Sequence, residues 1–183
     1  MNDKNIYDIY VAGRGSAALA VAVHLGLFPL LDEKPRTEKE VSSALSIAPR
    51  GARSLLRALR GLDLIVQDGD NFSLSPQSAN YLVPGRSGYL GGLIELEVHS
   101  PLTPKSLLEA VRSGCAQVYG DETWSAHEND EERAARFTQA MHSISEIPAK
   151  ALVSNYDFSE HRKLLDIGGG SGVYAAEALE HNT

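Results

Sequence analysis

The residues with the clearest chemical potential lie in one short stretch near the C-terminus. Asp166 is followed by glycines at alternate positions, as Asp166-x-Gly168-x-Gly170-x-Gly172. An apolar run at residues 163–167 leads into these glycines, and residues 173–180 have the composition of a helix. The sequence therefore predicts a strand, a glycine loop and a helix in that order. Because glycine permits positive φ and close approach of a ligand, and a helix N-terminus offers free N–H groups, this loop is a candidate ligand site.

The spacing of this loop argues against a dinucleotide as the ligand. The dinucleotide fingerprint requires a third small residue after two intervening positions, and Val173 stands there. A tight strand-to-helix turn that binds nothing is the alternative that the residues alone leave open.

The elements that must position the loop begin with a helix at residues 16–27. This helix is rich in Ala, Val and Leu and apolar on nearly every side. We therefore expect it to be buried, either in a core or against a partner chain, and we expect Pro29 to end it. Thr37, with Glu40 three positions later, forms a capping-box pattern that opens a second helix.

A third helix, expected at residues 49–62, is amphipathic. At about 100° per residue its leucines share one face and its arginines share the opposite face. The leucines are Leu55, Leu56, Leu59 and Leu62, and the arginines are Arg50, Arg53, Arg57 and Arg60. Two short apolar segments around Asp68-Gly69 follow and predict a β-hairpin. Three helices and a hairpin in this order predict a winged helix.

A winged helix with a basic face suggests a DNA-binding regulator, since arginines can contact phosphates. The formal net charge of −7 and the lack of Asn or Gln on the arginine helix argue against nucleic acid as a partner. A solvated outer face over a leucine core is the favoured interpretation.

Further helices are expected at residues 93–98, 104–112 and 131–147. The last begins in an acidic turn that suits a helix N-terminus, and we expect Pro148 to end or kink it. The predicted fold is therefore mainly α with a small β-hairpin, a winged helix plus a helical linker. The first strand, loop and helix of an α/β Rossmann-like domain follow.

The glycine pattern resembles the first motif of class I S-adenosylmethionine-dependent methyltransferases. The order of winged helix, helical linker and glycine loop resembles the dimeric O-methyltransferases of plant phenolic and hydroxyindole type and their bacterial relatives. Three phrases are similar to that family: His24-Leu25-Gly26-Leu27-Phe28, Leu55-Leu56-Arg57-Ala58-Leu59 and Phe137-Thr138-Gln139-Ala140-Met141. The resemblance covers essentially the whole chain.

This resemblance implies three regions: a winged-helix dimerisation domain at 1–100, a helical linker at 101–158 and an incomplete cofactor-binding domain at 159–183. It implies S-adenosyl-L-methionine as cofactor, a small and aromatic hydroxyl acceptor, and a homodimer formed by the N-terminal domain. The cofactor-binding residues it implies are Asp166, Gly168, Gly169, Gly170, Trp124, Met141 and Ser145. Phe137 is the implied acceptor-binding residue. From the residues alone, core packing is an equal alternative for Phe137 and Met141.

The family's catalytic histidine and ribose-binding acid would lie beyond Thr183, so the chain is expected to be inactive alone, as a fragment or a natural truncation. A non-catalytic dimerisation protein is therefore a further hypothesis. The sequence has six histidines, none at the expected catalytic position and none in a metal-ligand pattern. Its single cysteine, Cys115, and its polar N-terminus predict a cytoplasmic protein without a membrane segment. The 43% apolar and 22% charged shares are ordinary for a globular chain.

Overall fold

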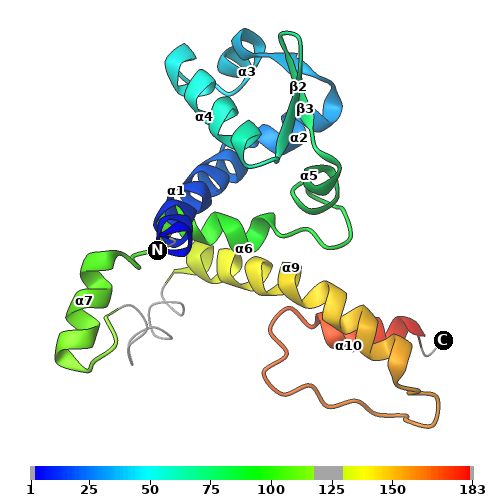
Figure 1. Ribbon diagram of the computed structural model, residues 1–183. Coiled ribbons are helices and arrows are strands. Elements are labelled where there is room, and N and C mark those ends of the chain that lie inside the picture. Colours follow the sequence, from blue (N-terminus) through cyan, green and yellow to red (C-terminus); the bar gives the residue numbers. More distant parts are fainter. Residues whose placement is uncertain (1–2, 118–129, 182–183) are drawn as a thin grey trace.

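The computed structural model describes residues 3–117 and 130–181. The N-terminal helices and strands gather at one end, and the long helix α9 separates them from α10 (Figure 1). In chain order the elements are α1 (Lys4–His24), α2 (Leu27–Glu33), β1 (Arg36–Thr37), α3 (Glu38–Ala44), α4 (Pro49–Gly61), β2 (Ile65–Asp68), β3 (Asn71–Leu74), α5 (Pro76–Tyr81), α6 (Gly91–Glu95), the 3-10 helix η1 (Leu96–His99), α7 (Pro104–Ser113), α9 (Glu131–Asn155) and α10 (Val173–His181). The mainly helical fold with one small sheet is confirmed.

The winged helix forms as its local signals predict. At the start of α3 the Thr37 Oγ1 accepts a hydrogen bond from the Glu40 N–H at 3.3 Å. The Glu40 Oε2 accepts one from the Thr37 N–H at 2.8 Å, so the capping box is complete. Strands β2 and β3 pair antiparallel across Gly69, whose φ is +58°, as the hairpin requires. β1 pairs with the other side of β3, giving the order β1-β3-β2.

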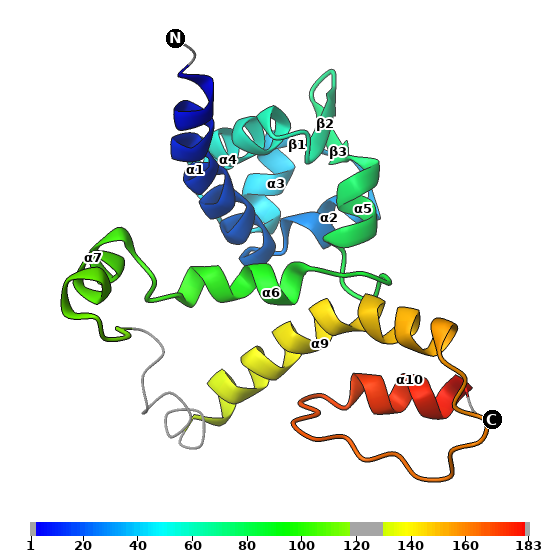
Figure 2. The same ribbon diagram turned by 60° about the horizontal axis from the view of Figure 1, so that its bottom comes forward.

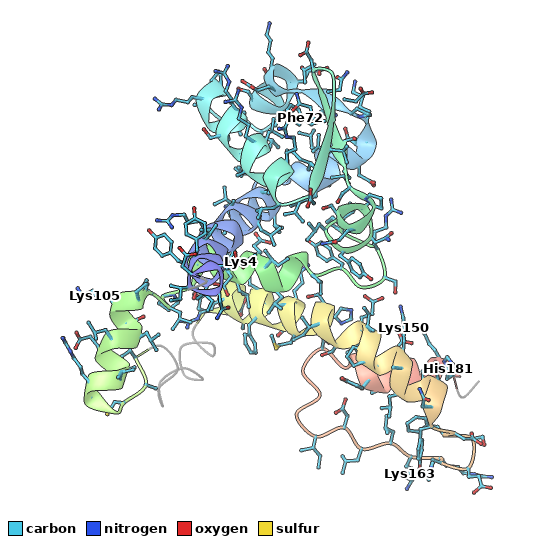
Figure 3. All side chains as sticks on the ribbon, viewed as in Figure 1. Lys4, Phe72, Lys105, Lys150, Lys163 and His181 are labelled. Carbon is cyan, nitrogen blue, oxygen red and sulfur yellow. The ribbon has the colours of Figure 1, made fainter. Side chains whose placement is uncertain are left out.

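The core of this domain lies under α4. Leu56 and Leu59 of α4 are fully buried, and Phe28 of α2 and Phe72 of β3 pack into the same cluster (Figure 3). Leu62, which was predicted to share the buried leucine face, is 42% exposed. It lies at the C-cap of α4, after the last helical residue.

The first helix differs from its expected bounds at both ends. α1 begins at Lys4 rather than at residue 16, and Gly26, at φ +73°, separates it from α2. Pro29 ends no helix; it lies in the first turn of α2, where a missing N–H leaves no hydrogen bond unmade. By length and composition alone α1 could cross a membrane, and only 11% of that apolar window is buried within this chain.

Helix α9 packs against α6 on one side and against α10 on another (Figure 2). It runs through Pro148 to Asn155, so of the two expected effects of Pro148, an end or a kink, the end does not occur. Residues before and after the proline, among them Ser143 and Ala149, are buried. Packing on both sides of Pro148 therefore keeps the chain helical, although proline lacks a backbone N–H and one hydrogen bond is missing there.

The strand expected at residues 163–167 does not form; this segment has no regular secondary structure. Leu165 and Ile167 are 82% and 86% exposed, and Lys163 lies out in the loop away from α9 (Figure 3). The physical reason is that strand hydrogen bonds require a neighbouring strand, and the described sheet consists of β1, β3 and β2 alone. The helix expected after the loop does form, as α10.

Replacing the buried Leu56 by Ala tests the core. The substitution removes packed methyl groups and leaves a cavity, so the free energy of unfolding should fall by about 2–5 kcal/mol. The matched control, Leu107→Ala on α7, removes the same atoms from a side chain that is 57% exposed and should cost much less. Urea denaturation followed by circular dichroism measures both; equal losses would contradict the assignment of the core.

Candidate functional site

A cavity of about 900 Å³ lies between the glycine loop and α9. One wall is a face of α9, formed by side chains spaced four residues apart, Phe137, Met141 and Ser145. The opposite wall is the loop at residues 166–171 and the first residues of α10. The structure thus brings together predicted site residues from two separate regions of the sequence: Phe137, Met141, Ser145, Asp166, Gly168, Gly169 and Gly170.

The loop takes a shape that only glycine adopts without strain. Gly168, Gly170 and Gly172 have φ of +72°, +55° and +74°. The Gly172 N–H donates to the Gly169 carbonyl at 2.8 Å, which closes the turn, and Gly172 in turn accepts from the first turn of α10. No atom lies within 4 Å of a Cβ built on Gly168 or Gly170. The backbone there is open to a ligand.

Asp166 places a carboxylate on this loop. A Cβ at Gly169 would collide with the Asp166 carboxylate, so the absence of a side chain at Gly169 lets the carboxylate fold over the backbone. The cavity therefore combines a negative charge, backbone N–H groups at the start of α10 and an apolar wall of Phe137 and Met141. That combination suits an elongated ligand with a charged, amino-acid-like end and a less polar middle.

One contact of the loop was not anticipated from the sequence. His142 Nδ1, on α9, lies 3.0 Å from Ser171 Oγ, in the loop. His142 belongs to no motif of the sequence, so no pattern reveals a partner 29 residues away.

The remaining predicted site residue, Trp124, lies outside the described residues, as does His127. Two further histidines make contacts outside this cavity. His24 Nδ1 lies 3.2 Å from Glu95 Oε1, and His161 Nε2 lies 3.0 Å from the Tyr156 hydroxyl. In the part of the chain that the structure describes, no three His, Cys, Asp or Glu side chains gather as metal ligands.

The arginine face of α4 is partly occupied by contacts within the chain. Arg53 Nε donates to Glu38 Oε1 at 2.9 Å, and Arg60 donates to Gln67 Oε1 at 2.7 Å. Arg50 and Arg57 are exposed. Pairing of two of the four arginines with neighbours weakens a continuous phosphate-binding surface.

Two family models match the chain. The O-methyltransferase dimerisation domain matches residues 10–84, and the O-methyltransferase domain matches residues 105–182. The N,N-dimethyltransferase OxyT of Streptomyces rimosus is 34% identical over 97% of this chain and 54% of its own length. The tetracenomycin polyketide synthesis 8-O-methyl transferase TcmO of Streptomyces glaucescens is 35% identical over 94% of this chain and 51% of its own length.

The fold is also that of solved structures. Human N-acetylserotonin methyltransferase, in complex with SAM, superposes with a TM-score of 0.83 at 22% identity, over 97% of this chain and 55% of that one. The chain spans about half the length of the curated relatives it matches.

The arginine face should not bind DNA selectively. In a gel shift with random and genomic duplexes at physiological salt, micromolar protein should retain neither, because the net charge is −7 and two arginines are paired within the chain. Reversing the charge of the two exposed arginines, Arg50→Glu with Arg57→Glu, should change nothing. Sequence-selective retention that this double substitution abolishes would show a DNA-binding surface.

Proposed function

Since the chain belongs to the O-methyltransferase family with an N-terminal dimerisation domain, we propose that it binds S-adenosyl-L-methionine between the glycine loop and α9 and serves methyl transfer to a small molecule. The observation that carries this proposal is the cavity itself. It joins the loop and the α9 face from two regions of the sequence, and its lining fits the charged amino-acid end of that cofactor and the less polar chain that leads to its sulfur.

The residues of the loop would hold the amino-acid end of the cofactor. The Asp166 carboxylate can accept hydrogen bonds from the ammonium group, and the free N–H groups at the start of α10 can donate to the carboxylate. Gly168, Gly169 and Gly170 would let the ligand approach the backbone, since the space beside Gly168 and Gly170 is open.

The residues of α9 would line the reacting end. When bound, S-adenosylmethionine supplies a methyl group on a positively charged sulfur. Met141 and Phe137 would form an apolar wall beside that sulfur and keep water away, and the Ser145 hydroxyl is a polar group on the same face. Phe137 is also proposed to contact the acceptor, and Trp124 is proposed to contact the cofactor from the sequence resemblance.

The proposed acceptor is a hydroxyl of a small aromatic molecule. Names of relatives support this class, among them the 8-O-methyl transferase TcmO and a 3-hydroxy-5-methyl-1-naphthoate 3-O-methyltransferase of Streptomyces sahachiroi. OxyT, named an N,N-dimethyltransferase, favours an amine as a second candidate acceptor. A matched pair of acceptors, 2-naphthol and 2-naphthylamine, separates the two when their binding to the chain is compared by ligand-detected NMR, which requires no turnover.

The proposed assembly is a homodimer formed by the N-terminal domain. An apolar groove of about 450 Å³ runs between α1 and the end of α4, and Val11, Leu19 and Leu62 are among its lining residues. Ile6, Ile9 and Tyr10 on the same helix are more than 60% exposed. A second copy covering α1 would bury this apolar surface. The proposed location is the cytoplasm, in keeping with the lone Cys115, which forms no disulfide.

Gly168→Val tests the cofactor site. The 183-residue chain should bind S-adenosylhomocysteine in about the millimolar range, or about −4 kcal/mol, because the loop and α9 contact one end of the ligand. Valine at φ +72° is strained and its side chain enters the open space, so binding should be lost. Gly51→Val, in α4 at negative φ, is the control and should bind as the parent chain does. Calorimetry or ligand-detected NMR reports the affinities; unchanged binding by Gly168→Val would mean that the loop is only a turn.

Val11→Glu tests the dimer. The parent chain should have the mass of a dimer by light scattering at tens of micromolar. A carboxylate in the apolar groove beside α1 should produce monomers, because burying it is costly. Val66→Glu places the same charge on the exposed β2 strand, outside the groove, and should leave the dimer intact. A monomeric parent chain would refute this assembly.

A further inference from the structure

Within residues 168–172 of the glycine loop, a single side chain is available to attach the loop to the rest of the protein. Of residues 168–172, four are glycine and the fifth is Ser171. Ser171 stands between Gly170 and Gly172, both at positive φ, so its backbone is held by residues that turn easily. The position of the loop therefore depends strongly on what the Ser171 hydroxyl contacts.

That hydroxyl contacts the helix that forms the opposite wall. Ser171 Oγ lies 3.0 Å from His142 Nδ1, within hydrogen-bonding distance. His142 directly follows Met141, which lines the cavity, and precedes Ser145 by three residues. The hydrogen bond thus joins the two walls of the cavity at its edge.

We propose that His142 is a positioning residue that holds the glycine loop against α9 through Ser171 and so sets the width of the proposed cofactor site. This inference rests on the proposed function for its effect on cofactor binding. The effect on the loop itself is independent of any ligand.

The segment before the loop gives it little support, which makes this hydrogen bond important. Residues 163–167 form no strand, and Leu165 and Ile167 are largely exposed. Within the loop, the Gly172-to-Gly169 hydrogen bond closes a turn but fixes nothing relative to α9. The hydrogen bond between Ser171 and His142 fixes the position of the loop relative to α9.

His142 is well placed for this role because its side of α9 is itself anchored. Glu146 and Lys150 follow it at four-residue spacing, and Lys150 Nζ donates to Glu146 Oε1 at 2.7 Å and to Ser87 Oγ at 3.3 Å. The pKa of Glu146 is lowered, chiefly by the hydrogen bond from Lys150, with smaller effects from the Gly88 N–H and from His142. Lys150 lies along α9, as labelled in Figure 3. The contacts of Glu146 and Lys150 fix α9 against the segment that follows α5. His142, on the same side of α9, adds a contact to the glycine loop.

The test compares two substitutions of similar size. In His142→Asn the side-chain amide stands near the place of Nδ1 and can keep a hydrogen bond to Ser171, whereas His142→Leu cannot. Ser171→Ala removes the partner, and the double variant His142→Leu with Ser171→Ala completes a thermodynamic cycle. Because His142 and Ser171 are exposed, all variants should keep the fold, which thermal unfolding checks.

The first readout is NMR of the ligand-free chain. His142→Leu and Ser171→Ala should lower the ¹⁵N heteronuclear NOE of residues 168–172 without affecting α4, and His142→Asn should not. The ring-nitrogen shifts of His142 should move in Ser171→Ala. Unchanged loop order in both His142→Leu and Ser171→Ala would overturn the proposal.

The second readout is affinity for S-adenosylhomocysteine. His142→Leu and Ser171→Ala should each weaken binding about three- to tenfold, and the double variant should be no weaker than either of them. His142→Asn should stay near the parent value. Additive losses would overturn the proposal. Failure of the parent chain to bind would count against the proposed function alone, since the NMR readout still decides whether His142 holds the loop.

Discussion

The packing of α9 against α6 is the constraint on which the cavity depends. The two helices approach closely where Gly92 meets Ala140 and Ser143: a Cβ on Gly92 would lie 3.3 Å from the Gln139 carbonyl oxygen. With this side of α9 fixed, Phe137, Met141 and Ser145 point towards the glycine loop. Turning α9 by one residue, about 100°, would carry all three away from the loop. The buried contact with α6 therefore decides which face of α9 can meet a ligand.

Much of the N-terminal domain could be predicted because its signals act over three or four residues. Thr37 with Glu40, and Asp68 with Gly69, specify their hydrogen bonds or turns locally. The start of α1 was missed because its two glycines, Gly13 and Gly15, resemble a loop. In the structure, a Cβ on Gly15 would lie 3.3 Å from Leu62, so this glycine serves close packing of α1 on α4. Such a reason depends on tertiary structure and has no local signature.

The candidate site was predictable in its parts and not in its assembly. Alternating glycines after Asp166 marked the loop, and the spacing of Phe137, Met141 and Ser145 marked one face of a helix. The resemblance to a family, rather than periodicity, predicted that the glycine loop and this helix face form one site, and the shared cavity supports that prediction. The contact between His142 and Ser171 was beyond either approach, because it depends on how far the loop folds back onto α9.

The loop keeps its shape without a sheet because its two ends are held differently. After the loop, Val173 and Ala178 of α10 are buried and α10 packs on α9, so that end is fixed by apolar contact. Before the loop, apolar side chains such as Leu165 are exposed and give no support. At that end, the Asp166 side chain folded over Gly169 restrains the loop locally. Positive φ at Gly168 and Gly170 then turns the chain between these ends. The cavity is therefore defined from the helical side, by α9 and α10, and this is why polar contacts of α9 can govern its width.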